Sequence, residues 1–263
     1  MSSYYKDEYR KTHNDGLSVT PEERFQFQAF KSKRIATAVR ELVPEGGSIL
    51  DIGCSAGGLL GHLVDDYECF GSEWNPEDAS FVRDSGVPCE EGALTDIYPD
   101  KKFTAITAID VLEHQTDPIQ FLKNVRSRLI GGGYLYMELP NIDDALVSLY
   151  DIPEFKDYWY RQPHITYWNA QTLSSVMTWL GFEARLDWIQ RYGLANHMHW
   201  LLERTPMKDP YAARDLIKPV PKSHSASAAL NRIWTHLDHE YRIQLRSNLM
   251  SDTITVRARL TQI

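Results

Sequence analysis

The feature that most constrains this chain is an alternation of short apolar runs and amphipathic segments between residues 48 and 139. Strands that alternate with helices form a mostly parallel sheet with helices on both of its faces, so we expect an α/β fold. Apolar periodicity predicts the elements in this order: strand 48–53, helix 57–66, strand 68–73, helix 76–85, strand 88–91, strand 103–109, helix 118–130 and strand 134–139.

The segments on either side of this region are less regular. Residues 1–19 are polar and rich in tyrosine, and we expect either a lid over the ligand or disorder; a capped helix then begins after Thr20. The stretch 141–168 is a loop rich in aromatic residues, which would wall an acceptor or form a small core of their own. The predicted remainder is helix 170–180, strand 182–190, a proline-punctuated connection at 204–224, an amphipathic helix with one buried stripe at 226–249, and a last strand, "TITVRARL".

Charge and cysteine usage exclude several classes of protein. The formal charge of −8 comes without a strong lysine or arginine cluster, so we expect neither nucleic acid nor an anionic membrane surface as partner. No apolar run reaches the roughly 18 residues of a membrane helix, and the N-terminus lacks the apolar core of a signal peptide. The three cysteines lack zinc-site spacing, so we expect reduced thiols in a cytoplasmic protein.

The stretch "SILDIGCSAGG", residues 48–58, is typical of a strand that enters a ligand-binding turn. Small residues there let main-chain N–H groups approach a ligand. Glu73 lies 20 residues after Gly53, at the end of the next strand, where a carboxylate accepts hydrogen bonds from both hydroxyls of a ribose. Asp51, just before the turn, suits a ligand with an ammonium group and would repel a pyrophosphate. These features favour an adenosyl ligand over a nicotinamide dinucleotide.

Four motifs then occur in order: "LDIGCSAGGLL", "GSEW", "AIDVLEH" and "LIGGGYLYMELPN". Together they resemble the class I S-adenosylmethionine-dependent methyltransferases over roughly residues 40–190. The resemblance implies a Rossmann-like, seven-stranded, mostly parallel sheet with an antiparallel last strand. It also implies S-adenosyl-L-methionine as cofactor, with S-adenosyl-L-homocysteine as product. The implied cofactor-binding residues are Asp51, Gly53, Ser55, Gly57, Glu73, Trp74, Ala93, Leu94, Asp110 and Val111.

The resemblance gives these residues separate roles. Trp74 would pack on the adenine, and Asp110 and Val111 would line the methionine end. Two departures stand out. Ser55 replaces a usual glycine, and Ala93 and Leu94 stand where many members carry an aspartate that reaches the adenine, so backbone groups or Asp96 would have to serve.

We expect one domain over residues 1–263, with an N-terminal lid and helix at 1–45, a cofactor-binding core at 46–190 and the final strand at 251–263. Ligands of open α/β sheets lie beyond the carboxyl ends of the strands. The insertions at 141–168 and 191–250 would therefore hold the acceptor.

A hydroxyl acceptor needs a base, for which His164 in "QPHITYW" is our first candidate, followed by His114 and His197. A structural role of His164 in fixing its loop is the alternative. His197 and His199 would share a face if their segment is extended, but further metal ligands are missing, so we expect no metal site.

The acceptor is expected to be a small molecule. "RYGLANHMHWLLE", residues 191–203, resembles an element of methyltransferases that tailor sugars and polysaccharides, which implies O-methylation of a nucleotide-sugar or glycan precursor. Two alternatives stay open: a nicotinamide-dependent reductase, although helix 118–130 lacks the tyrosine of a tyrosine–lysine pair, and a non-catalytic scaffold that only binds the cofactor.

Overall fold

The chain divides into two compact units, seen here in a computed structural model that describes residues 20–160, 163–207 and 227–261. The first unit comprises residues 1–138, 174–185 and 256–263, and the second comprises 139–173 and 186–255. The expected lid at 1–19 and most of the connection at 204–224 lie outside the described residues.

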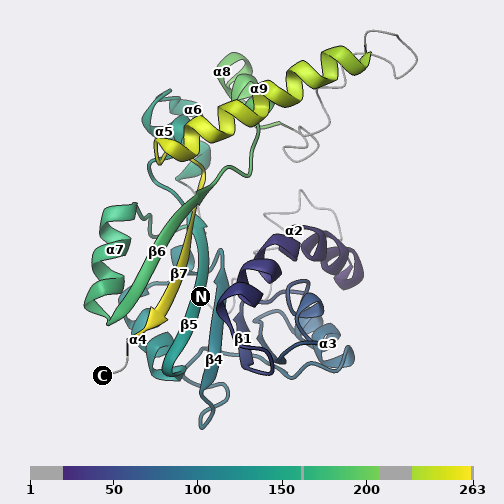
Figure 1. The fold of residues 1–263 in the computed structure, drawn as a ribbon, viewed down its shortest axis with the longest axis vertical. Coiled ribbons are helices and arrows are strands. Elements are labelled where there is room, and N and C mark those ends of the chain that lie inside the picture. The colour runs from purple at the N-terminus through teal and green to yellow at the C-terminus, as the bar shows by residue number, and fades with distance from the viewer. Residues whose placement is uncertain (1–19, 161–162, 208–226, 262–263) are drawn as a thin grey trace. The chain divides into compact units, whose positions relative to one another are not determined.

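A seven-stranded sheet forms the centre of the first unit, in the order β3-β2-β1-β4-β5-β7-β6. Strands β1 to β5 pair in parallel, whereas β7 runs opposite to β5 (Figure 1). The predicted α/β sheet with an antiparallel last strand is therefore confirmed. The strands are β1 (Ser48–Ile52), β2 (Glu68–Ser72), β3 (Cys89–Glu90), β4 (Phe103–Ile109), β5 (Leu129–Pro140), β6 (Phe182–Ile189) and β7 (Thr253–Leu260).

The register of the central strands brings their carboxyl ends together. Ile52 of β1 lies beside Ser72 of β2 and Ala108 of β4. The residues that follow, including Gly53, Glu73 and the start of "DVLEH", consequently leave the sheet at one edge. That edge is where open α/β sheets bind their ligands.

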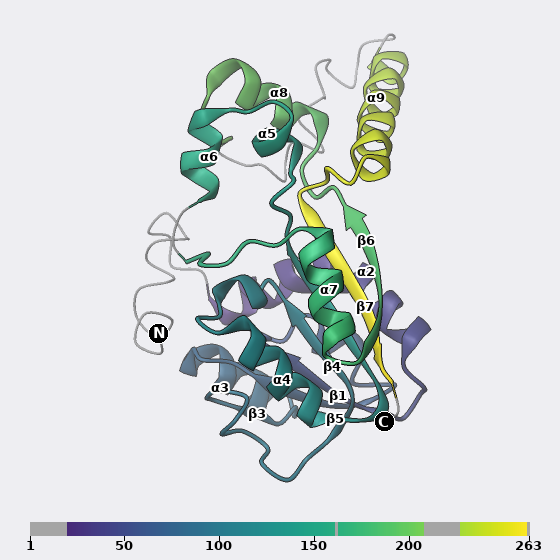
Figure 2. The ribbon, with the colours of Figure 1, turned by 90° about the vertical axis from the view of Figure 1, so that its left-hand side faces the viewer.

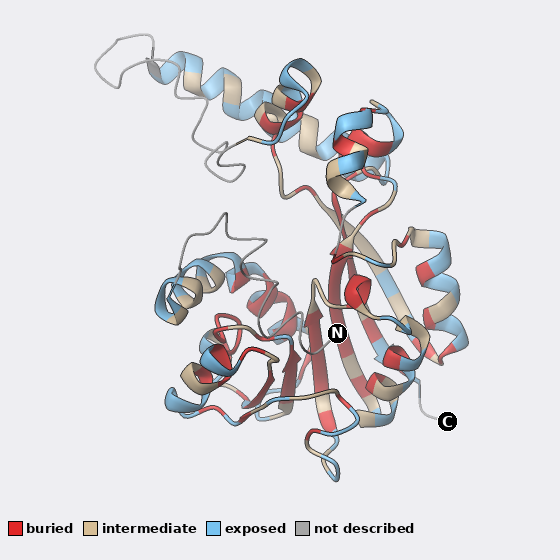
Figure 3. Cartoon of the chain, turned by 180° about the vertical axis from the view of Figure 1, so that it is seen from behind, coloured by how far each residue is buried: buried red, intermediate tan, exposed pale blue. Residues whose placement is uncertain are grey.

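Helices cover both faces of this sheet. Helices α2 (Pro21–Leu42) and α3 (Pro76–Asp84) lie on one face, and α4 (Pro118–Arg128) and α7 (Ala170–Trp179) lie on the other (Figures 1 and 2). Helix α2 begins with the predicted capping box, in which the Thr20 hydroxyl accepts from the Glu23 N–H while the Glu23 carboxylate accepts from the Thr20 N–H. The buried residues of the central strands form the core between the two helix layers (Figure 3).

Two predicted helix boundaries in the first unit are wrong. Instead of a helix at 57–66, only a single 3₁₀ turn forms, η2 (Leu60–His62). The glycines 131–133 do not end helix α4, which ends at Arg128; they belong to β5. Adjacent glycines are compatible with an extended strand as well as with a helix stop, so their presence alone did not fix the boundary.

The second unit is mainly helical, with α5 (Ala145–Ser148), α6 (Pro153–Trp159), α8 (Leu194–Glu203) and α9 (Ser227–Ser247). Short helices thus replace part of the loop predicted at 141–168. Phe155 and Trp200 pack edge to face at 4.9 Å in a small core, against which Tyr158 and Trp159 lie partly buried. Of the aromatic residues of the 141–168 segment, Tyr158 and Trp159 therefore pack against a local core.

Two further predictions for this unit are corrected. The segment around His197 is helix α8, not an extended strand, so His197 and His199 do not lie on one face of a strand. The apolar stripe of α9 is not buried: Leu245 is buried, but Ile233 and Leu237 are 56% and 44% exposed (Figure 3). Helical spacing identifies an apolar face but not what covers it.

The three cysteines are free and buried. No helix among the described residues is long and apolar enough to cross a bilayer.

Candidate functional site

The glycine turn after β1 uses backbone conformations that favour residues without a side chain. Gly53 and Gly57 have φ values of +69° and +81°. The Gly53 and Cys54 N–H groups donate to the Ser72 carbonyl at 2.8 and 3.1 Å, which holds the turn against the end of β2. A Cβ on Gly53 would lie 3.0 Å from Val111, so Val111 closes on the turn. The sheet therefore brings the motif that contains Gly53 and the motif that contains Val111 together.

Glu73 reaches the same turn. One oxygen of its carboxylate, Oε2, accepts from the Ser55 N–H at 2.9 Å, and Oε1 accepts from the Asn75 N–H at 2.8 Å. Both bonds fix the direction of the carboxylate at the carboxyl end of β2. A carboxylate has about four acceptor positions, so it can still accept from a diol.

Asp51 lies beneath the turn and is 4% exposed. The Thr107 hydroxyl, on the neighbouring strand β4, donates to Oδ1 of Asp51 at 2.6 Å. Burial raises the pKa of the Asp51 carboxyl to about 7, and the negative charge of Glu73 contributes to this rise. Sequence reasoning missed Thr107. Its signal is the register in which Thr107 lies directly beside Asp51.

Asp110 and Val111 follow β4 at the same edge. Asp110 has a positive φ of 54°, an uncommon conformation for a residue with a side chain, and its N–H donates to the Glu138 carbonyl at 2.9 Å. Strand β5 thereby fixes the bend at which "DVLEH" leaves the sheet. Both predicted residues are half-buried.

Trp74 and the segment after β3 carry the residues predicted to contact the adenine. Trp74 and Ala93 are half-buried, Leu94 is buried, and Asp96 is exposed. The Arg128 guanidinium, at the end of α4, donates to the carbonyls of Leu94 and Ile97 at 3.0 and 2.9 Å. Arg128, which sequence reasoning missed, therefore organises the backbone of a segment that lacks the usual aspartate.

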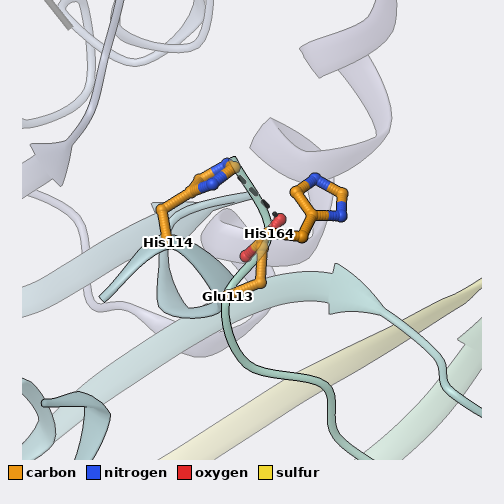
Figure 4. A group of neighbouring side chains, drawn as sticks. All are labelled: Glu113, His114 and His164. Carbon is orange, nitrogen blue, oxygen red and sulfur yellow. Dashed lines mark ion pairs between the residues drawn. The ribbon is translucent and has the colours of Figure 1, made fainter. Parts of the chain in front are cut away.

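His114 lies in the 3₁₀ turn η3 (Leu112–His114) that follows Val111. Its Nε2 lies 3.8 Å from Oε1 of Glu113, and both side chains are buried (Figure 4). The two residues form a local acid–histidine pair within the first unit.

The other two predicted catalytic histidines belong to the second unit. His164 is half-buried, and its ring lies 6.5 Å from that of Trp159 and 6.1 Å from that of Tyr167. His197 is 1% exposed, with Nδ1 2.7 Å from the Tyr241 hydroxyl and Nε2 3.1 Å from the Gln190 amide. Burial lowers the pKa of His197 to about 4, so its ring is neutral at pH 7.

A hollow of about 530 Å³ also opens on the first unit, but it contains none of the predicted site residues. Its lining comes mainly from β6 and β7 and includes Arg185, Arg257 and Arg259. The glycine turn remains the candidate site because the acidic groups converge there.

A family model described as a methyltransferase domain matches residues 26–186, more than half of the chain. The chain belongs to this methyltransferase family. The matched region contains the glycine turn, Glu73 and Asp110.

Individual relatives are distant. The tRNA U34 carboxymethyltransferase of Colwellia psychrerythraea is 24% identical over 209 residues, which cover 71% of this chain and 63% of that protein. Two solved structures share the fold. A methyltransferase from Archaeoglobus fulgidus described as SAM-dependent has a TM-score of 0.58 at 16% identity, covering 90% of this chain and 97% of that one. A chain from the complex between the Haloferax volcanii Trm112 methyltransferase activator and a methyltransferase has a TM-score of 0.57 at 15% identity, with 92% and 93% covered.

Proposed function

We propose that this methyltransferase transfers the methyl group of S-adenosylmethionine to a hydroxyl of a small, sugar-derived metabolite. One observation carries the cofactor part of this proposal: a buried carboxylate, Asp51, and an oriented one, Glu73, lie at the same glycine turn. These groups match the two ends of the cofactor, an ammonium group and a ribose diol. A pyrophosphate held at the turn would instead be repelled by Asp51.

The chain's own residues would hold the cofactor as follows. Asp51 accepts from the ammonium group, and Glu73 accepts from the ribose hydroxyls. The backbone of Gly53, Ser55 and Gly57 lies along the ligand, and Asp110 and Val111 line its methionine end. Trp74 packs on the adenine, and backbone groups at Ala93 and Leu94 contact its edge. The bound sulfonium supplies an electrophilic methyl group, so the protein has only to align the acceptor and remove its proton.

For the proton we propose His164 as general base. The two other candidates suit that role less. The ring of His197 is buried with a partner at each nitrogen, and His114 is buried beside Glu113. General bases typically contribute about 10²–10⁴-fold to a rate. His164→Ala should therefore lower kcat by about 100-fold or more and leave the Kd for cofactor within about twofold.

The cofactor assignment is tested by binding. Glu73→Ala should weaken the Kd for S-adenosylhomocysteine by about tenfold or more, because hydrogen bonds to a charged group are lost. Glu91→Ala removes an exposed carboxylate just after β3, which pairs with Arg83, and should leave the Kd unchanged. Binding of NADH in preference to S-adenosylhomocysteine would refute the proposal and favour a reductase.

The acceptor is tested by mass spectrometry. Incubation with S-adenosylmethionine and a panel of nucleotide-sugars should give a product heavier by one methyl group, together with S-adenosylhomocysteine. A tRNA pool serves as the comparison, because one distant relative acts on tRNA. The net charge of −8 favours the small molecules. Methylation of tRNA alone would refute the acceptor class, and cofactor binding without turnover on any acceptor would favour a scaffold.

A further inference from the structure

Ser55 occupies a position in the glycine turn that glycine would adopt more easily. Its φ of 46° lies in the left-handed region, which costs a residue with a Cβ about 1–2 kcal/mol. Its hydroxyl donates to Oδ2 of Asp78 at 3.0 Å. The serine is therefore held in this conformation by a partner on a different element, helix α3.

Asp78 is a fully buried carboxylate that connects three elements. Besides accepting from Ser55, it accepts through Oδ1 from Nε and Nη2 of Arg24 at 2.9 and 2.7 Å. Arg24 is on helix α2, and its side chain is 14% exposed. Asp78 itself is fixed by its N–H, which donates to the α3 cap residue Asn75. Charge-assisted hydrogen bonds of this kind are among the stronger ones in proteins.

Helix α2 is packed directly on the segment that follows the turn. A Cβ on Gly58 would lie 2.4 Å from Cβ of Gln28 and 2.6 Å from the N of Ala29, both on α2. The ring of Phe25, next to Arg24, lies 6.0 Å from that of Phe81 on α3. The position of Arg24 is thus set by close packing.

We propose that Asp78 and Arg24 are positioning residues for the cofactor, acting through Ser55. They hold Ser55 in the left-handed conformation in which its N–H donates to Glu73. The Glu73 carboxylate then keeps the direction required for the ribose diol. Helix α2 in this way contributes to cofactor affinity through the Arg24–Asp78 pair. The inference rests on the proposed cofactor site.

The test is a double-mutant cycle on cofactor binding. Asp78→Asn keeps the volume but removes the charge, and it should weaken the Kd for S-adenosylhomocysteine about tenfold, the loss expected for a charge-assisted hydrogen bond. In turnover, the KM for S-adenosylmethionine should rise by a similar factor while kcat stays within twofold. Glu77→Gln is the matched control: Glu77 is the neighbouring acid on α3, exposed and 4.0 Å from Arg24, and its variant should bind normally.

Ser55→Gly separates positioning from general packing. Glycine adopts the positive φ without Asp78, so this variant alone should weaken binding only about threefold. Adding Asp78→Asn to it should cost less than a further twofold. Such non-additivity is expected when one residue acts through the other. A full tenfold loss in both backgrounds would overturn the inference.

Thermal unfolding without cofactor serves as the control that each variant is folded. Should Asp78→Asn fail to fold, Ser55→Ala tests the same link, because it retains the strained Cβ but loses the hydroxyl; it should bind more weakly than Ser55→Gly. Equal affinity of Ser55→Ala and Ser55→Gly, or unchanged affinity in a folded Asp78→Asn variant, would overturn the inference. Failure of the wild-type protein to bind S-adenosylhomocysteine would refute the proposed function instead.

Discussion

We expect Asp51 to make cofactor binding dependent on pH in a range where few carboxylates titrate. In the cofactor-free protein its pKa is raised to about 7, chiefly by burial. A cofactor ammonium group is attracted to the ionised carboxylate only. The apparent Kd is therefore the intrinsic Kd divided by the ionised fraction. That fraction is about three-quarters at pH 7.5 and about one-tenth at pH 6 for a pKa of about 7. The Kd should consequently be about eightfold weaker at pH 6 than at pH 7.5.

Isothermal titration with S-adenosylhomocysteine measures this effect without turnover. At pH 7 about half of the Asp51 carboxyls are protonated, so binding should release about half a proton per site. The released proton is measured by comparing the heat of binding in two buffers with different ionisation enthalpies. Asp51→Asn removes the titrating group and still accepts from Thr107. It should bind more weakly, with little dependence on pH and no proton release.

The reasoning is refuted if the wild-type Kd changes less than twofold between pH 6 and pH 7.5 and no proton is released. The variant then identifies the faulty step. If Asp51→Asn binds as tightly as the wild type, Asp51 does not contact the ammonium group. If it binds much more weakly, the contact exists but the carboxyl is already ionised at pH 6.

Two further predictions concern stability. In the second unit, burial raises the pKa of Asp144 well above its ordinary value and that of Asp252 to about 6. The stability contributed by the protonated carboxyls is complete below the unfolded pKa of about 4; that of Asp252 is lost as the pH rises through about 6, and that of Asp144 as the pH rises through its own raised pKa. Asp144→Asn should stabilise the protein in urea unfolding by about 1–3 kcal/mol at pH 8 and have little effect at pH 4; stabilisation at pH 4 as large as at pH 8 would contradict this. Gly58→Ala should lower the free energy of unfolding by about 1–3 kcal/mol because its Cβ meets Gln28, whereas Gly131→Ala, with nothing within 4 Å, should not; equal effects would show that α2 can shift at no cost.

The elements with a clear period were predictable. Strand 103–109 and the last strand "TITVRARL" form as predicted, because a mainly apolar run and an alternating apolar and polar pattern each favour a strand. The helix predicted at 57–66 does not form, and part of the reason lies outside that segment. Its apolar residues fit a helix, but Gly57 adopts a positive φ and the close approach of α2 at Gly58 shapes this segment. The apolar pattern of residues 57–66 cannot show that a helix formed by residues 21–42 packs against them.

Contacts across the sheet were also beyond sequence reasoning. Thr107 donates to Asp51 from a position 56 residues away, and only the pairing of β1 with β4 makes them neighbours. Apolar patterns do not predict the strand register, because they indicate which face of the sheet a side chain lies on but not which residue of the neighbouring strand lies beside it. The same limit explains α9. Its apolar stripe was correctly identified as helical, yet Leu237 is exposed because burial depends on what packs there.

The two departures from the methyltransferase pattern have a common explanation in the fold. Serine in place of the usual glycine at position 55 costs backbone strain, and Asp78 offers its hydroxyl a buried, charged acceptor. Near Ala93, where the usual aspartate is missing, Arg128 holds the backbone carbonyls of Leu94 and Ile97 in place. In each case a side chain from a helix outside the motif, Asp78 on α3 or Arg128 on α4, supports the backbone at the position where the motif departs from the pattern. A motif that departs from the family's sequence pattern can therefore retain its geometry, provided that the compensating side chain is present. Loss of cofactor affinity on removal of Asp78, but not of Glu77, is the sharpest check on that argument.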